Sequence, residues 1–179
     1  MGRLVLVLGG ARSGKSAFAQ RLAASLDGPV VYVATAEAGD EEMRSRIARH
    51  RRARPKQWRT VEAPQGLSRR LSQLARRSGT LVVDCLSLYV ANLLDPFSER
   101  PASPAAKRAV LKEVRAVLRE ARRWEGTVIV VSNEVGQGVV PPTPLGRAYR
   151  DLLGEANQLV AGRADEVYWM VAGIPVRVK

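Results

Sequence analysis

Residues 4–16 read LVLVLGGARSGKS, and this stretch decides the fold. The apolar run Leu4–Leu8 predicts a strand that is buried on both faces. The eight residues that follow match the phosphate-binding pattern G-x-x-x-x-G-K-[S/T] in full. A helix is expected from Gly14 to about Leu26, because apolar residues recur there at helical spacing. A strand before the pattern and a helix after it distinguish a phosphate-binding loop from a glycine turn that matches by chance.

The residue types of this loop suit the phosphates of a nucleotide. Glycines let the backbone curl, so that its N–H groups converge on phosphate oxygens at a helix N-terminus, where the dipole favours anions. Lys15 would reach the β- and γ-phosphates as a catalytic cation, and Ser16 would offer a hydroxyl ligand to Mg²⁺. We therefore predict that nucleotide is bound by Gly9, Gly10, Ala11, Arg12, Ser13, Gly14, Lys15 and Ser16.

Strands and helices alternate along the rest of the chain. The patterns predict strands over 30–33, 58–62, 80–84, 127–132, 166–171 and 175–178 and helices over 40–54, 67–77, 86–94, 105–124 and 152–164, with loops at 95–104 and 136–146. This alternation predicts an α/β fold whose mostly parallel sheet is flanked by helices and ends in an antiparallel C-terminal strand. A chain of 179 residues has the length of one domain, so we expect a single domain over 1–179.

Composition limits the classes of function. The chain carries 29 Lys and Arg against 17 Asp and Glu, a net charge of +12, which indicates an anionic partner such as a nucleotide or nucleic acid. Its one cysteine, Cys85, excludes a disulfide framework and favours a cytoplasmic location. The apolar runs are far shorter than the roughly 20 residues that cross a bilayer, so we expect no membrane span.

Two further side chains are candidates for metal binding and catalysis. Asp84 ends a buried strand, where a carboxylate would hold the Mg²⁺ shell, although acids also end strands as turn formers. His50 is the only histidine, and on a helix Arg46 and Arg54 lie four residues to either side. Positive neighbours disfavour the imidazolium form, so His50 could be a neutral nucleophile or base among arginines that hold a triphosphate. The alternative is a surface histidine on a basic, solvated helix.

Several segments together resemble one family, the bifunctional adenosylcobinamide kinase / adenosylcobinamide-phosphate guanylyltransferase of cobalamin biosynthesis. The phosphate loop is generic, but the histidine segment over 46–55 and Asn133-Glu134-Val135-Gly136 make the resemblance specific. Residues 58–60, 164–167 and 171–175 also fit, so the resemblance covers nearly the whole chain.

The resemblance implies two reactions. In the first, a hydroxyl of adenosylcobinamide is phosphorylated from ATP or GTP. In the second, a histidine attacks the α-phosphorus of GTP and releases pyrophosphate. The GMP then passes from the histidine to adenosylcobinamide phosphate, which gives adenosylcobinamide-GDP. His50 stands at the nucleophile position, and because Arg49 precedes it, there is no second histidine to compete for the role.

The resemblance also implies a RecA-like P-loop fold, a homotrimer and further contacts to the nucleotide. On the residues alone, Thr35 could be a turn or cap residue and Glu62 an ordinary acid at a strand edge. Asn133 and Glu134 follow a buried strand, where α/β sheets present ligands, but cap and turn roles compete. The implied nucleotide contacts are Ala34, Thr35, Ala36, Arg51, Arg52, Ala53, Arg54, Glu62 and Asp84, with Ser16 and Asp84 as the Mg²⁺ ligands.

Two other functions are compatible with the residues. A simpler small-molecule kinase would need Lys15, Ser16 and Asp84 but not His50. A nucleic-acid-dependent ATPase or nucleic-acid-binding module would account for the charge. However, Trp58 is the only aromatic residue near the arginine run that could stack on a base, and no nucleic-acid-binding motif is recognised. The partners that the resemblance implies are GTP, ATP, adenosylcobinamide and its phosphate, and we expect no nucleic acid.

Overall fold

The structure, a computed structural model that describes residues 2–52, 54–74 and 78–179, contains one seven-stranded sheet. Its strands are β1 (Arg3–Gly9), β2 (Val30–Ala34), β3 (Arg59–Glu62), β4 (Ser78–Asp84), β5 (Glu125–Val131), β6 (Glu166–Val171) and β7 (Ile174–Arg177). They lie in the order β3-β2-β4-β5-β1-β6-β7. Neighbours pair in parallel from β3 through β6, and β7 is antiparallel to β6. The predicted mostly parallel sheet with an antiparallel C-terminal strand is thus confirmed.

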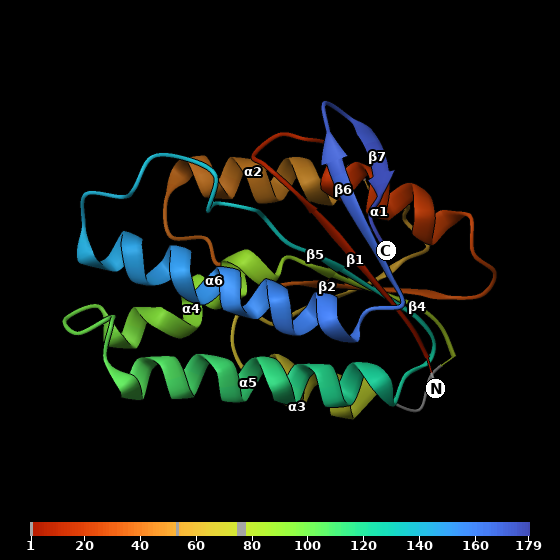
Figure 1. Cartoon of the computed structure of the whole chain (residues 1–179). Coiled ribbons are helices and arrows are strands. Elements are labelled where there is room, and N and C mark those ends of the chain that lie inside the picture. The colour runs from red at the N-terminus through yellow and green to blue at the C-terminus, as the bar shows by residue number, and fades with distance from the viewer. Residues whose placement is uncertain (1, 53, 75–77) are drawn as a thin grey trace.

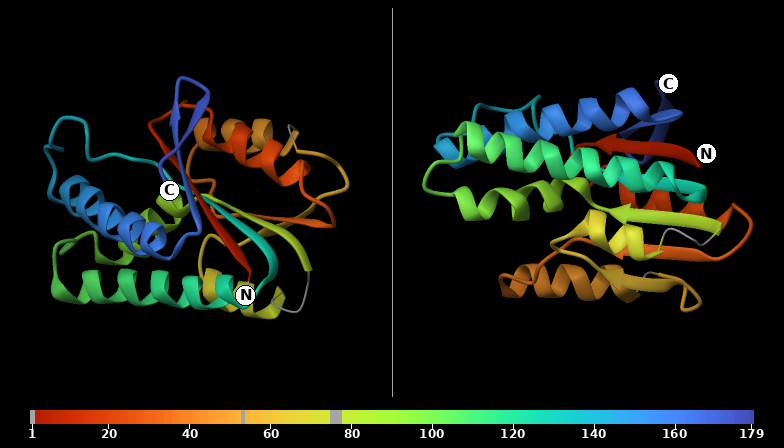
Figure 2. Two further views of the ribbon diagram at one scale, coloured as in Figure 1. Left: turned by 45° about the vertical axis from the view of Figure 1, so that its right-hand side comes forward. Right: turned by 90° about the horizontal axis from the view of Figure 1, so that it is seen from below.

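Helices cover both faces of the sheet. They are α1 (Lys15–Ala24), α2 (Glu41–Arg52), α3 (Leu67–Leu74), α4 (Leu86–Leu94), α5 (Pro104–Arg122) and α6 (Pro144–Arg163). Figures 1 and 2 show α1 and α2 on one side and the other four on the opposite side. None of these helices, within the described ranges, is long and apolar enough to cross a membrane.

The central strands are apolar throughout because both of their faces are covered. In β1, Val5 and Val7 belong to the core on the α1 side, where Ala19 packs. Leu4 and Leu6 belong instead to the larger core shared with α3 to α6. The continuous apolar run that predicted a strand buried on both faces therefore does form one.

The largest departure from the predicted elements is the start of α6. The sequence predicts a loop over 136–146 and a helix from Leu152, whereas the helix begins at Pro144. Thr143 caps it by accepting a hydrogen bond from the Gly146 N–H at 3.1 Å, and proline suits a first helical position. These start signals outweigh the glycines and prolines that made the segment look like a loop.

Other elements lie close to their predicted positions. The helix predicted over 40–54 corresponds to α2, which ends at Arg52, and Ala53 lies outside the described residues. The helix predicted over 67–77 corresponds to α3, and residues 75–77 also lie outside the description. Within the loop predicted over 95–104, residues Asp95–Phe97 form a short 3₁₀ helix, η1.

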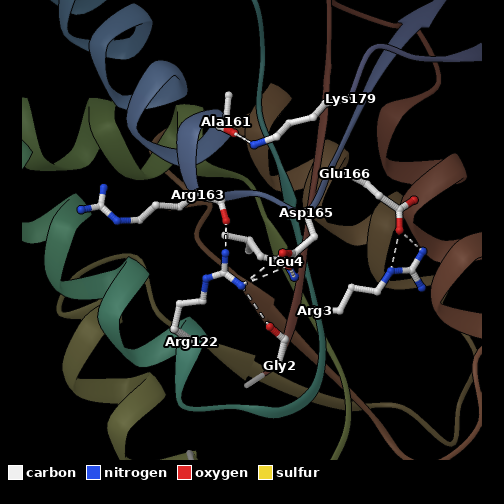
Figure 3. Close-up of polar contacts among 9 residues, drawn as sticks. All are labelled: Gly2, Arg3, Leu4, Arg122, Ala161, Arg163, Asp165, Glu166 and Lys179. Atoms are coloured by element: carbon white, nitrogen blue, oxygen red, sulfur yellow. Dashed lines mark hydrogen bonds and ion pairs between the residues drawn. The ribbon is translucent and has the colours of Figure 1, made fainter.

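A polar network ties the start of β1 to the start of β6, at the end of the sheet opposite the phosphate loop (Figure 3). The Leu4 N–H donates to Asp165 Oδ2 at 2.6 Å, and the Asp165 N–H donates to the Leu4 carbonyl at 2.8 Å. Arg122, the last residue of α5, donates to the same carboxylate at 3.1 Å and to the Gly2 carbonyl at 3.3 Å. The network thereby aligns β1, whose far end carries the phosphate loop.

This network predicts a stability that depends on pH. The Leu4 N–H, followed by Arg122, lowers the pKa of the Asp165 carboxyl below its ordinary value of 3.8. The contribution of the ionised Asp165 carboxylate to the free energy of unfolding is therefore complete above about pH 4 and is lost as the pH falls through the folded-state pKa. We expect Asp165→Ala to lower the free energy of unfolding by about 1–2 kcal/mol at pH 7, because the Leu4 N–H loses its acceptor, and by less at pH 3. Urea unfolding at both pH values measures the difference.

A matched control is Asp151→Ala, which removes an exposed carboxylate paired with the adjacent Arg150 at 2.9 Å. Exposed ion pairs contribute little, so we expect this change to lower the free energy of unfolding by less than about 0.5 kcal/mol. An equal loss of stability at pH 7 and pH 3 for Asp165→Ala would contradict a role for the carboxylate charge.

Candidate active site

The phosphate loop needs glycine at two positions for steric reasons. Gly14 has φ +91°, a left-handed conformation that residues with a Cβ rarely adopt, and it begins α1 by accepting from the Phe18 N–H at 2.9 Å. A Cβ at Gly9 would stand 2.7 Å from Ser13 Oγ and 2.8 Å from the Met170 carbonyl oxygen. Both glycines of the pattern are thus required by the geometry around them.

The turn between β6 and β7 packs against this loop. The Gly173 N–H donates to the Ser13 carbonyl at 3.0 Å, and Gly173 Cα lies 3.2 Å from where a Cβ on Gly14 would stand. Lys15 is only 7% exposed and folds back over the loop, where its ammonium donates to the Gly10 carbonyl and to Ser13 Oγ. The C-terminal hairpin therefore supports the segment that carries the lysine.

A pocket of about 980 Å³ opens at the carboxyl ends of the parallel strands and is lined by both the phosphate loop and α2. This is the end of a parallel sheet at which α/β proteins bind their ligands. The pocket brings together Lys15 and Ser16 from the loop and His50 from α2, which the sequence leaves far apart. The predicted residues on its wall are Arg12, Ser13, Gly14, Lys15, Ser16, Ala34, Ala36, His50, Arg51, Arg54, Glu62 and Asp84.

The remaining predicted residues have other positions. Gly9, Gly10, Ala11, Thr35 and Arg52 are not among the wall residues of the described structure, and Ala53 lies outside the description. The Thr35 hydroxyl is fully buried. It accepts from the Cys85 N–H at 2.8 Å and donates to the Cys85 carbonyl at 2.7 Å. Thr35 thus holds the backbone that follows β4, while a nucleotide contact through it stays a prediction.

The structure also distinguishes the two residues whose roles the sequence left open. Asn133 lines the pocket, as expected for a residue just beyond a strand of a parallel sheet. Glu134 instead accepts a hydrogen bond from the Gly136 N–H through Oε1, which is a turn role. The wall also contains residues that sequence reasoning missed, namely Ala17, Tyr32, Glu37, Ala38, Glu41, Met43, Ser45, Ile47, Arg49, Pro64, Cys85, Leu88 and Val131.

Tyr32 is the least expected of these residues, because it lies within a buried apolar strand and looks like a core residue. Its hydroxyl donates to Asp84 Oδ2. Burial, followed by the Asp84 carboxylate, raises the pKa of Tyr32 well above its usual range, so its hydroxyl stays protonated. Arg54 lies over the same ring, with its guanidinium carbon 3.8 Å from the ring centroid.

Two of the hydrogen-bond donor atoms of Arg54 lack an acceptor among the described residues. Its Nε and Nη1 atoms are buried and have no hydrogen-bond partner within the residues that the structure describes. Leaving buried donors unsatisfied is costly, and Arg54 as a whole lies on the pocket wall. Arg51 forms an ion pair with Glu62 across α2 and β3. The part of the pocket wall formed by α2 and the residues just after it is therefore rich in guanidinium groups.

Cys85 lines the pocket but is not suited to nucleophilic chemistry. Burial, followed by the neighbouring Asp84 carboxylate, raises the pKa of the Cys85 thiol to about 11. A thiol becomes a strong nucleophile when it ionises, and a raised pKa opposes ionisation at neutral pH. His50 is therefore a better candidate for covalent attack on a phosphate in this pocket.

The residues present fit a magnesium ion that arrives with a nucleotide. No group of three or more His, Cys, Asp or Glu side chains within the described ranges could hold a metal ion. Mg²⁺ is commonly held by one or two protein oxygens together with substrate phosphates and water, rather than by an all-protein cage. Ser16 and Asp84 supply such oxygens on the wall beside the phosphate loop.

Together, the loop, the sheet and the pocket define a P-loop nucleotide-binding protein. The fold resembles that of a solved ATPase from the type III secretion system of pathogenic bacteria, with a TM-score of 0.60 and 13% sequence identity. The match covers 96% of this chain and 51% of the ATPase chain. At this identity the likeness concerns the fold alone, and it confirms the predicted fold class.

The chain belongs to the CobU family, described as cobinamide kinase / cobinamide phosphate guanyltransferase, whose model matches residues 5–178. It is 45% identical over 174 residues to the bifunctional adenosylcobalamin biosynthesis protein CobP of Pseudomonas aeruginosa, covering 97% of this chain and 96% of that protein. The CobU proteins of Escherichia coli and Salmonella typhimurium are 37% and 38% identical, over 98% of this chain and 99% of each relative. The resemblance found in the sequence is confirmed, and the chain is an enzyme of this bifunctional class.

Proposed function

We propose that the enzyme phosphorylates adenosylcobinamide from ATP or GTP and then transfers GMP from GTP to adenosylcobinamide phosphate through a guanylylated His50. The main support is that His50 and the phosphate loop line one pocket, although they come from different elements. One pocket can therefore hold a triphosphate against both the lysine and the histidine. Family membership favours two activities over the simple kinase that would leave His50 unused.

The kinase step needs positioning and charge more than covalent chemistry. Lys15 and the loop N–H groups would hold the phosphates while the oxygen of a substrate hydroxyl attacks the γ-phosphorus, forms a new P–O bond and releases its proton to solvent. The bond between that phosphorus and the bridging oxygen breaks, and the nucleoside diphosphate leaves. Mg²⁺, when bound, would be held by Ser16 and Asp84 and would offset the charge of the phosphate oxygens.

The guanylyl transfer proceeds in two displacements. An imidazole nitrogen of His50 attacks the α-phosphorus of GTP, a P–N bond forms, and pyrophosphate leaves as the α–β bridging bond breaks. A phosphate oxygen of adenosylcobinamide phosphate then attacks the same phosphorus, and the P–N bond breaks to restore the histidine. Arg51 and Arg54, on the wall near His50, would stabilise the negative charge that develops in both displacements.

The covalent intermediate can be tested by intact-protein mass spectrometry after incubation with GTP and Mg²⁺. We expect an adduct with the mass of GMP on the peptide that contains His50. Acid should remove it, as it does a phosphoramidate, and hydroxylamine treatment adds a second chemical test. If GTP binds but no adduct forms, the enzyme transfers phosphoryl groups without a guanylylated histidine, and this proposal is wrong. Homotrimeric assembly, a single domain and a cytoplasmic location stay predictions.

A further inference from the structure

Tyr32 occupies the centre of a set of contacts that the family motifs do not explain. Tyr32 lies in β2 and is only 1% exposed, but it still forms part of the pocket wall. Its hydroxyl donates to Oδ2 of Asp84 at the end of β4, the strand that pairs with β2. Because a carboxylate at a strand end can otherwise rotate, this bond limits the directions in which Asp84 presents its oxygens to the pocket.

The ring of Tyr32 has a second role. The guanidinium carbon of Arg54 lies 3.8 Å from the centroid of the Tyr32 ring. The Trp58 ring stacks with the Tyr32 ring at a centroid distance of 6.5 Å and an interplanar angle of 27°. Arg54 and Trp58 belong to the segment that follows α2, the helix that carries His50. A cation held against an aromatic face away from water is attracted more strongly than one at an exposed site. The ring therefore anchors the end of the histidine helix to the sheet.

We propose that Tyr32 is a positioning residue that fixes the Asp84 carboxylate through its hydroxyl and the Arg54 guanidinium through its ring. Both charges lie on the wall of the pocket proposed to hold the nucleotide. The proposal deepens the function proposed above and rests on it only for the identity of the nucleotide. It does not require that His50 become guanylylated.

The two contacts should have separable consequences. A group that orients a metal-binding carboxylate tunes the affinity for the metal, and loss of such a partner typically lowers metal affinity by about 10–100-fold. The ring contact acts instead on Arg54, which lies on the pocket wall and whose positive charge would attract phosphate oxygens. Its effect should persist when Mg²⁺ is absent.

The first test uses Tyr32→Phe, which removes the hydroxyl and keeps the ring. Binding of GTP is measured by isothermal titration calorimetry with Mg²⁺ and with EDTA. We expect about tenfold weaker binding with Mg²⁺, at the low end of the range for groups that orient a metal ligand, and less than about twofold change with EDTA. Equal affinities for Tyr32→Phe and wild type in Mg²⁺ would overturn the role of the hydroxyl.

Tyr168→Phe is the matched control. It also removes a tyrosine hydroxyl that donates to a carboxylate, Glu166 Oε2, at 2.7 Å, but Tyr168 is not among the described wall residues. GTP affinity should be unchanged in both conditions. If this variant weakens binding in Mg²⁺ as much as Tyr32→Phe does, the effect reflects general loosening of the sheet and the proposal is wrong.

The second test uses Arg54→Lys, which keeps the charge but loses the planar group that stacks on Tyr32. We expect it to weaken GTP binding about tenfold in EDTA as well as in Mg²⁺. Wild-type affinity for Arg54→Lys in EDTA would overturn the role of the ring. Because both tests measure binding, failure to detect a guanylylated histidine would refute the proposed function without affecting this outcome.

Discussion

Replacing His50 with asparagine should abolish guanylyl transfer and leave part of the kinase activity. Asparagine cannot form the covalent intermediate, and removal of an enzyme's nucleophile has lowered kcat by about 10⁴-fold or more in well-studied cases. The kinase step as proposed uses the phosphate loop and Asp84 but no group from His50, so we expect it to keep at least about a tenth of its rate. Separate assays of the two products, with mass spectrometry for the GMP adduct, measure both effects.

Arg44→Gln provides a control on the same helix. Arg44 is exposed, pairs with Glu41 at 3.1 Å and is not among the described wall residues of the pocket, so both activities should stay near those of wild type. Guanylyl transfer at a near wild-type rate in His50→Asn would show that His50 is not the nucleophile. A simultaneous loss of both activities would instead indicate that α2 has to be intact for the kinase reaction.

Replacing Lys15 with alanine should remove both activities. The ammonium is held inside the phosphate loop by the Gly10 carbonyl and Ser13 Oγ, close to where the β- and γ-phosphates would bind. Loss of one preorganised donor to a developing negative charge costs about 10²–10³ in kcat. Because we propose one pocket for both reactions, the kinase and the guanylyl transfer should fall together, as measured by the two assays and by GTP affinity.

Lys107→Ala is the control for this change. It removes a lysine that pairs with Glu155 at 2.6 Å between α5 and α6, and it should leave both activities unaffected. If Lys15→Ala destroys one activity and spares the other, the two reactions do not share the phosphate loop. Circular dichroism and thermal unfolding of the variant exclude general misfolding as the cause of the loss.

Several features followed from the sequence alone because they depend on local patterns. The glycines, the lysine and the serine of the phosphate loop fall within eight residues, and the strand and helix around them are encoded by their own apolar spacing. The alternation of strands and helices predicted a parallel sheet, and the family followed from the loop together with the segments around His50 and Asn133. The fold class and the family could therefore be predicted without knowledge of any contact between distant residues.

The tertiary structure decided how those segments meet. Strand order is not encoded locally, so the sequence did not show that β5 lies between β1 and β4 or that the ends of these strands form one pocket with α2. The apolar neighbours of Tyr32 in sequence predict only a buried core residue. They do not predict its hydrogen bond to the Asp84 carboxylate, which lies 52 positions away in sequence. The support of the phosphate loop by Gly173 was hidden in the same way. Local periodicity determines which residues form an element and which faces are buried, whereas contacts between distant residues arise only when the strands are ordered and the helices packed.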